Sequence, residues 1–128
     1  MIKRSLHKRF GQAVLSGVKT TTIRDNPWPV GVPIMLYNWS GKPYGSKHSD
    51  VCAVVVDRVE RISIQKIEGG EMCYIVKDGV LHDLWKSEGF ESQSDMDDWF
   101  SPMLPNWCAN RPDGFNLLKH LMHFRRVA

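Results

Sequence analysis

The stretch from Val51 to Val56 is an unbroken apolar run, and it constrains the fold of this chain more tightly than any other segment. All six residues are apolar, and four of them are valine. A short run of this kind, rich in β-branched residues, is typical of a strand that is covered on both faces. Apolar residues recur at Val59, Ile62 and Ile64. We therefore expect a long strand that is buried on both faces at Val51–Val56.

Shorter segments on either side of this strand show helix and strand patterns. Phe10 and Val14 are four residues apart, as on one face of a helix, and Gly17 is suited to end that helix. Segment 115–127 mixes strand-like alternation with a Leu-rich centre, so we expect a strand, with a helix as the alternative. The expected elements are helices at 7–16, 81–89 and 94–101 (with Ser94 as N-cap), strands at 20–23, 33–39, 72–76 and 115–127, an exposed loop at 40–50 and a turn at 68–70.

These elements together predict an α+β fold, built on a compact sheet or small β-barrel with short flanking helices. The chain has 128 residues, so we expect one domain that spans 1–128. Its three cysteines are widely spaced, which indicates neither a disulfide framework nor a zinc knuckle and favours a cytoplasmic location. No apolar run is long enough for a membrane span or a signal-peptide core, so no membrane partner is expected.

Charge is distributed unevenly along the chain, although the formal net charge is only +3. Residues 1–24 contain six basic side chains and no acidic one. Residues 83–98 contain six acidic side chains and a single lysine. This asymmetry suggests a positive face and a separate acidic face, and the alternative is two solvated helix surfaces.

Glu88 occupies a position where the helix pattern calls for an apolar residue. Leu81, Leu84 and Trp85 form the apolar stripe of helix 81–89, and Glu88 is the next position on it. An inward carboxylate costs several kcal/mol unless it is paired or protonated. Glu88 is therefore a candidate general acid or base, or a ligand-binding group, at the floor of a cleft. The alternatives are a side chain that bends out to water and a structural ion pair with an arginine.

Polar side chains converge in the segment from Lys19 to Arg24. In a strand, Thr22 and Arg24 share one face, whereas Thr21 and Ile23 share the other, which we assign to the core. Lys19 precedes the strand and can swing over the polar face. Lysine, threonine and arginine at one place suit an anionic or strongly polar ligand, and a desolvated lysine can act as a base near neutral pH. The alternative is an ordinary polar edge strand.

The motif G-V-K-T-T-T-I-R-D at 17–25, after a short amphipathic helix, resembles the opening motif of the ASCH domain family. A turn at Gly31, the sequence E-G-F at 88–90 and the ending M-H-F-R-R at 122–126 are similar to later features of that family. The resemblance spans nearly the whole chain. It implies a PUA-like β-barrel and an association with RNA.

The form K-T-T-T-I-R-D is most similar to the small bacterial members that hydrolyse the amide of N4-acetylcytidine. The resemblance implies that Lys19 is the base, that Thr22 is the activated hydroxyl, and that Glu88 is a further acid/base or orienting group. Arg24 is implied to hold a ligand oxygen or the glutamate, Asp25 is a further candidate for contact with the substrate, and no metal or other cofactor is needed. The alternatives within the family are an RNA-binding module without catalysis and a ribonuclease that acts on single-stranded RNA.

Two further features bear on the substrate. Several aromatic residues flank the motif, and Trp28 and Tyr44, which we place on loops, are the best candidates to stack on a base. Segment 94–112 is an addition relative to the compact amidohydrolases. It contains Trp99, Phe100 and Trp107, which either cap the cleft or pack in the core, and core packing is the favoured interpretation.

Overall fold

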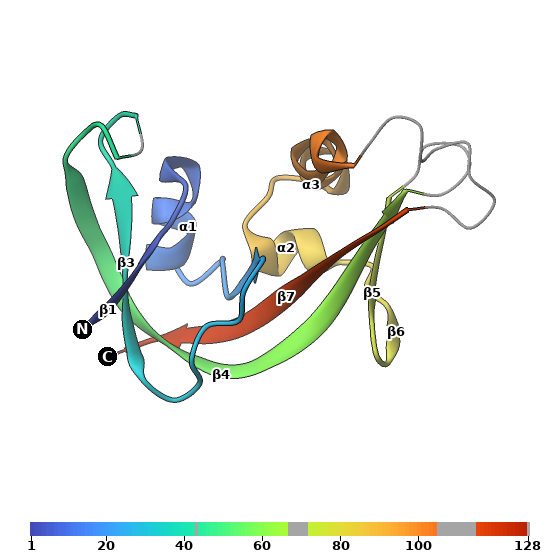
Figure 1. Ribbon diagram of the computed structural model, residues 1–128, viewed down its shortest axis with the longest axis horizontal. Helices are drawn as coiled ribbons and strands as arrows, with labels where there is room; N and C mark the ends of the chain where they lie inside the picture. The colour runs from blue at the N-terminus through green and yellow to red at the C-terminus, as the bar shows by residue number, and fades with distance from the viewer. Residues whose placement is uncertain (43, 67–71, 105–114, 128) are drawn as a thin grey trace.

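The computed structural model describes residues 1–42, 44–66, 72–104 and 115–127. A curved mixed sheet carries three short α-helices on its concave side, as Figure 1 shows. The strands are β1 (Ile2–Ser5), β2 (Thr21–Arg24), β3 (Pro33–Trp39), β4 (His48–Lys66), β5 (Met72–Val76), β6 (Gly79–Val80) and β7 (Phe115–Arg126). The helices are the 3-10 turn η1 (Lys8–Phe10), α1 (Gly11–Leu15), α2 (Leu84–Glu88), α3 (Gln93–Phe100) and the 3-10 turn η2 (Ser101–Met103).

The apolar run lies in β4, a strand of 19 residues that organises the sheet. β4 pairs antiparallel with β3, β5 and β7, and its register on β7 extends from Val54 to Lys66 with one bulge. β1 joins β3 in parallel, and β2 joins β7 antiparallel. Val54, Val55 and Val56 are buried, as predicted, whereas Val51, Cys52 and Ala53 are only partly buried, so the prediction of burial on both faces holds for half of the run.

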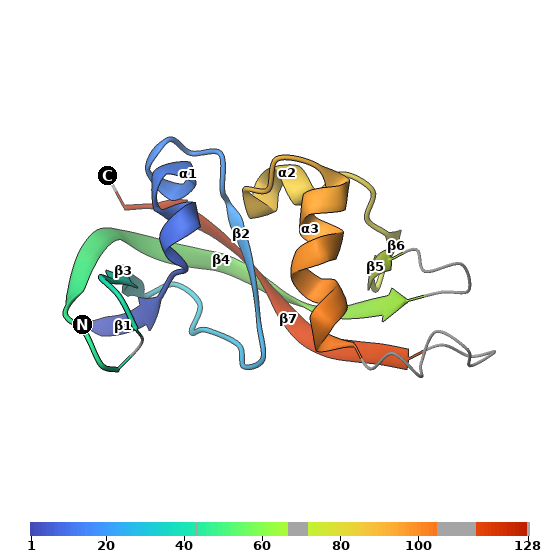
Figure 2. The same cartoon turned by 90° about the horizontal axis from the view of Figure 1, so that it is seen from above.

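The α+β architecture predicted from the sequence is confirmed, with the sheet open rather than closed. Its strand order runs β1-β3-β4-β5-β6, with β7 on β4 and β2 on β7. Within the described strands, β1 and β6 end this order and do not pair with each other. Figure 2 shows α1, α2 and α3 side by side over the concave face, with β2 running between α1 and α3.

Most predicted elements are present, with small changes at their ends. Strands 33–39 and 72–76 have the expected bounds, and segment 115–126 is a strand rather than the helix considered as an alternative. The N-cap of α3 is Ser92, not Ser94, because Ser92 has extended backbone and its Oγ accepts from Asp95 N over 3.0 Å. β1 was not expected, and the predicted turn at 68–70 lies outside the described residues.

The hydrophobic core fills the space between the helices and the concave face of the sheet. Its fully buried members come from α1, α3 and the four strands β3, β4, β5 and β7: Val14, Ile34, Leu36, Val54, Val56, Ile62, Ile64, Tyr74, Met96, Leu121 and Met122. Among the described residues, four buried side chains are polar or charged: Lys19, Thr21, Thr22 and Glu88. In the described part of the chain, no helix has both the length and the apolar character that a membrane crossing requires.

Candidate functional site

Lys19 is held between the ends of two helices. Gly17, at a φ of +80°, turns the chain out of α1, and the Lys19 amide then donates to the carbonyl of Ala13 over 2.9 Å. The next amide, that of Thr20, donates to the carbonyl of Ser87 at the end of α2 over 2.8 Å. These backbone bonds fix the main chain on both sides of the lysine, so its side chain starts from a defined place.

Gly89 lets α2 approach this lysine closely. It ends α2 in the left-handed conformation, with φ +89°. A Cβ at this position would lie 3.2 Å from the Cβ of Lys19 and 3.3 Å from that of Ala13. Glycine therefore meets both the conformational and the spatial requirement of this contact.

Glu88 points inward and meets Lys19, as the break in the helix stripe suggested. The side chains are almost completely buried, with Lys19 4% and Glu88 2% exposed. Lys19 Nζ donates to the backbone carbonyl of Glu88 over 2.7 Å and lies 3.9 Å from Glu88 Oε2. Nζ also lies 4.7 Å from the centre of the Phe10 ring. The water-exposed alternative for Glu88 is excluded, and its ionic partner is a lysine.

The environment of Lys19 favours its neutral form more than water does. Burial lowers the pKa of Lys19 from its usual 10.5 to about 8, the charge of Glu88 opposes this shift, and the charge of Arg24 adds to it. The neutral amine is therefore far more populated near neutral pH than that of an exposed lysine, which is the property that a general base requires.

Both threonines of β2 contact the charged residues, and Thr21 does so on the side that the sequence pattern assigned to the core. Thr21 Oγ1 donates to Glu88 Oε2 over 2.5 Å and lies 3.0 Å from Ser87 Oγ. Thr22 Oγ1 accepts from Arg24 Nε over 3.0 Å. Thr21 is buried, as its face of the strand predicted, but α2 covers that face of β2 and brings polar groups to it.

Arg24 is half-buried and has an aromatic partner rather than a carboxylate. Its guanidinium lies 4.9 Å from the centre of the Trp28 ring. No carboxylate of the described residues comes within ion-pair distance of it; the ion pairs formed there involve other cations. Burial lowers the pKa of Arg24, and the more distant charge of Glu88 opposes this.

These residues line a small cavity of about 180 Å³, which we call the inner cavity. Lys19, Thr22, Arg24 and Glu88 provide its polar wall, with His7 beside them. The other lining residues, which we call the aromatic wall, are apolar and mostly aromatic: Leu6, Phe10, Ile23, Phe90, Trp99 and Phe100. The ionisable side chains are those of His7, Lys19, Arg24 and Glu88. Together with the aromatic wall, they suit a flat, polar organic ligand better than a purely apolar one.

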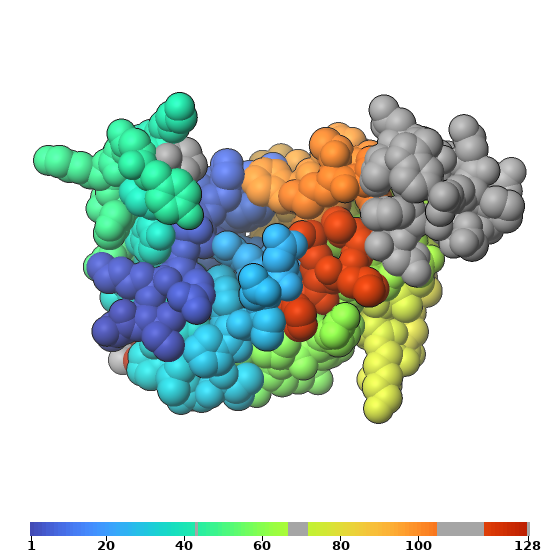
Figure 3. All heavy atoms as spheres, viewed as in Figure 1, coloured from blue at the N-terminus to red at the C-terminus, as the bar shows by residue number. Residues whose placement is uncertain are grey.

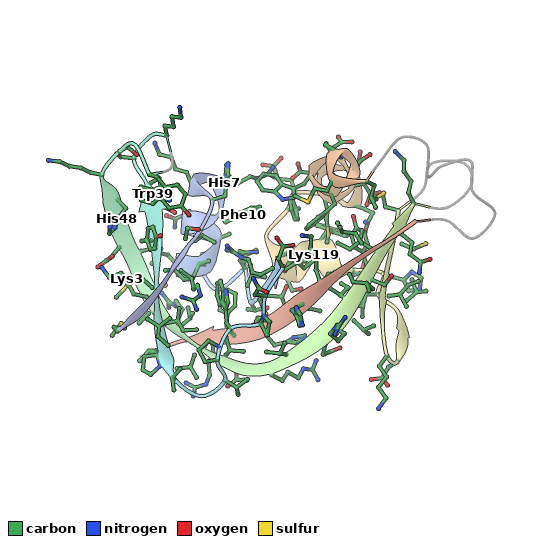
Figure 4. The ribbon with its side chains drawn as sticks, in the orientation of Figure 1. Lys3, His7, Phe10, Trp39, His48 and Lys119 are labelled. Carbon is green, nitrogen blue, oxygen red and sulfur yellow. The ribbon has the colours of Figure 1, made fainter. Side chains whose placement is uncertain are left out.

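A larger cavity of about 520 Å³, the outer cavity, adjoins the inner one. The two share Leu6, His7 and Arg24 as lining residues. The outer cavity also contacts Lys8, Trp39 and Tyr44. Figure 4 shows His7 and Phe10 in the space between α1 and α3, with Trp39 on the neighbouring β3. In the space-filling view the surface is hollowed between the N-terminal segment and α3 (Figure 3).

The structure brings most of the predicted site residues together, but not all of them. Lys19, Thr22, Arg24 and Glu88 line the inner cavity, and Tyr44, which is 91% exposed, borders the outer one. Asp25 lines neither cavity, because its carboxylate forms an ion pair with Lys119 of β7. Trp28 is buried beneath Arg24, so its ring is not free to stack on a ligand.

Some site residues had no signal in the sequence. His7 caps η1 by accepting from Arg9 N over 3.2 Å, and its ring packs edge-on against Trp99.

Trp99 and Phe100 of the added segment serve both of the roles considered for that segment. They pack in the aromatic cluster and also line the inner cavity. Trp107 lies outside the described residues.

The described residues contain no group of three or more His, Cys, Asp or Glu side chains that could hold a metal ion. The arrangement of Lys19, Thr22, Arg24 and Glu88 can deprotonate a hydroxyl, bind a polar ligand and stabilise developing negative charge. No protein-family model, curated protein or solved structure significantly matches the chain.

Proposed function

We propose that this protein is an amidohydrolase that acts on N4-acylated cytosine nucleosides, such as N4-acetylcytidine. The observation that carries the proposal is the buried contact between Lys19 and Glu88, with the Lys19 pKa lowered to about 8, on the wall of a small cavity. A depressed lysine pKa in a desolvated site is typical of a catalytic base. The resemblance to the small bacterial ASCH amidohydrolases gives the same three residues: Lys19, Thr22 and Glu88.

The reaction begins when the neutral amine of Lys19 accepts the proton of the Thr22 hydroxyl. Thr22 Oγ1 then attacks the amide carbonyl carbon, and the bond between that carbon and N4 breaks. The Lys19 ammonium returns its proton to N4, so cytidine leaves with a free amino group. A water molecule then attacks the acyl-threonine ester, which releases the carboxylic acid and restores the hydroxyl.

Arg24 and Glu88 support this sequence by electrostatics. Arg24 Nε donates to Thr22 Oγ1 over 3.0 Å, and this bond strengthens as the oxygen acquires negative charge. Glu88 stabilises the ammonium that Lys19 becomes, because its Oε2 lies 3.9 Å from Nζ. The bond from Thr21 holds that oxygen in place. Glu88 thus acts as an orienting and charge-balancing group.

The size of the inner cavity favours an acylated base over a whole nucleoside. Its volume of about 180 Å³ is below the range of about 300–1,000 Å³ that is usual for drug-sized ligands. The acylated edge of a cytosine fits such a space, with its ring against the aromatic wall. The ribose then extends past Leu6, His7 and Arg24 into the outer cavity.

The same proposal extends to the fold and the location. We take the curved open sheet to be a variant of the PUA-like barrel of ASCH proteins, and the protein to be cytoplasmic.

A second candidate function is an RNA-binding module without catalysis. It is favoured by one specific observation, the exposed Tyr44 ring beside Trp39 on the rim of the outer cavity.

Incubation of the purified protein with N4-acetylcytidine, followed by chromatography, tests the proposal. We expect cytidine and acetate in equal amounts, and we expect Lys19→Met, Thr22→Val and Glu88→Gln to lower the rate by at least about a hundredfold. Lys86→Met is the matched control, because Lys86 is an exposed lysine of α2 that lines neither cavity. Salt-dependent RNA binding without turnover overturns the proposal in favour of the module, and cleavage of single-stranded RNA favours a ribonuclease.

A further inference from the structure

The geometry points to the outer cavity as a binding site for a phosphate group attached to the substrate, so that the preferred substrate is a nucleotide rather than a free nucleoside. This inference rests on the proposed function for the identity of the base. It concerns binding in the outer cavity, which can be measured without turnover.

The outer cavity has the charge that a phosphate requires. Lys8 and Arg24 line it together with His7, and none of the described residues that line it is an aspartate or a glutamate. A concave surface with one sign of charge concentrates ligands of the opposite sign. The absence of acidic residues from segment 1–24 therefore has a structural counterpart, because much of this wall comes from that segment.

Arg24 lies where the two cavities meet, and no carboxylate of the described residues forms an ion pair with it. It lines both cavities, and only its Nε, which donates to Thr22, makes a side-chain hydrogen bond to the described residues. A half-buried guanidinium is normally paired with an anion, since desolvation of an unpaired charge is costly. The planar N–H groups of arginine bind phosphate oxygens in pairs. A phosphate carried into the outer cavity supplies the missing partner.

Lys8 is free to bind the same group. Its Nζ lies 3.5 Å from the carbonyl of Ser40, at the outer limit of a hydrogen bond. Such a weak contact holds a flexible ammonium loosely, so it can turn toward a phosphate at little cost. Lys8 and Arg24 thus approach the cavity from η1 and β2, two separate elements.

The aromatic rings of Trp39 and Tyr44 at the rim of the outer cavity bear on the source of the phosphate. It can belong to a mononucleotide or to a nucleotide within a nucleic-acid strand. The rings of Trp39 and Tyr44 lie 5.3 Å apart, and Tyr44 is held at a φ of +63° with its side chain 91% exposed. A positive φ is uncommon for tyrosine, so this exposed ring is retained in a strained conformation. In a nucleic-acid strand, the base next to the bound nucleotide can stack on the Tyr44 ring.

Calorimetric titration with cytidine and with cytidine 5′-monophosphate tests the inference. We expect the wild-type protein to bind the monophosphate about tenfold more tightly. Arg24→Gln should abolish this preference, and Lys8→Ala should reduce it about threefold. Lys77→Ala is the control, because this exposed lysine next to β5 lines neither of the two cavities. Equal affinity for the two ligands, no binding of either, or an equal effect of Lys77→Ala overturns the inference.

A cytidine trinucleotide in the same titration separates the sources. If the phosphate belongs to a strand, Tyr44→Ala should weaken trinucleotide binding about tenfold and Tyr44→Phe should not. If it belongs to a mononucleotide, the trinucleotide should bind no better than the monophosphate, and both Tyr44 variants should match the wild type. Because cytidine monophosphate has no amide to hydrolyse, a failed turnover assay with N4-acetylcytidine removes the proposed function without deciding this result.

Discussion

Thr21 donates a hydrogen bond of 2.5 Å to Glu88 Oε2, and both side chains are buried. The contact joins β2 to the last residue of α2, across 67 positions of sequence. It holds the carboxylate beside Lys19 and offsets part of the cost of burying it. The carboxylate thus depends on a residue outside the expected set of Lys19, Thr22 and Glu88.

Loss of this hydroxyl should lower both stability and activity. Thr21→Val keeps the shape of the side chain but leaves Glu88 Oε2 without its donor. We expect the free energy of unfolding to fall by about 1–3 kcal/mol in urea denaturation. Thr21→Ser retains the hydroxyl and should recover most of the loss. A valine variant as stable and as active as the wild type would contradict the assigned role.

The pH dependence of the rate should report the neutral form of Lys19. Because the Lys19 pKa is about 8, kcat/KM should rise with pH and level off above a midpoint near that value. Glu88 raises this pKa, so Glu88→Gln should move the midpoint of the residual activity to lower pH. Initial rates from pH 6 to 10 measure both, with Lys86→Met as the control that leaves the midpoint in place. A midpoint unchanged by Glu88→Gln contradicts the coupling.

Burial of Lys19 should also make stability increase with pH in the alkaline range. The unfolded chain has a Lys19 pKa near 10.5 and the folded chain one near 8, so between these values the unfolded state binds more protons. The free energy of unfolding should therefore rise as the pH increases through this window, by about 3 kcal/mol in total. Below the window, Lys19 should contribute no pH dependence. The difference in unfolding free energy between wild type and Lys19→Met, measured from pH 7 to 11, isolates this contribution. A difference independent of pH is the contrary result.

Local patterns sufficed to predict the parts of the fold and site that depend on local order. The apolar run predicted β4, and the stripe of helix 81–89 predicted the inward Glu88, because both arise from residues close together in sequence. Gly17 and the motif at 17–25 likewise placed Lys19 at the junction of α1 and β2.

The remaining features depend on contacts between distant segments. Asp25 pairs with Lys119, which is 94 positions away, and no local pattern indicates this. The face of Thr21 is decided by where α2 docks, and alternation along β2 carries no information about that. Whether a sheet closes depends on the pairing of its edge strands, and β1 itself has only four residues and no clear alternation.

Gly89 should be needed for the position of Lys19 as well as for stability. Alanine at this positive φ is strained by about 1–2 kcal/mol, and its Cβ would also lie 3.2 Å from the Cβ of Lys19. Gly17→Ala is a matched control, because Gly17 also has a positive φ but nothing lies within 4 Å of its added Cβ. We expect both variants to lose stability in thermal unfolding and only Gly89→Ala to shift the pH midpoint of kcat/KM. Equal midpoints in the two variants contradict the close-contact argument.

Trp99 should limit the size of the acyl group that the inner cavity accepts. It lines this cavity with Phe10 and Phe90, and its ring packs against both. Trp99→Leu removes part of this wall, so the ratio of kcat/KM for N4-benzoylcytidine to that for N4-acetylcytidine should rise about tenfold, as expected when a pocket gains room for a larger apolar group.

The control for this prediction is Trp85→Leu. Trp85 is also a half-buried tryptophan packed against the core, but it belongs to α2 and lines neither of the two cavities. We expect this variant to lose stability without a change in the ratio of the two substrates. If Trp85→Leu raises the ratio as much as Trp99→Leu, general loosening of the core explains the effect and the inner cavity does not select the acyl group. If neither variant changes the ratio, the acyl group binds away from the aromatic wall.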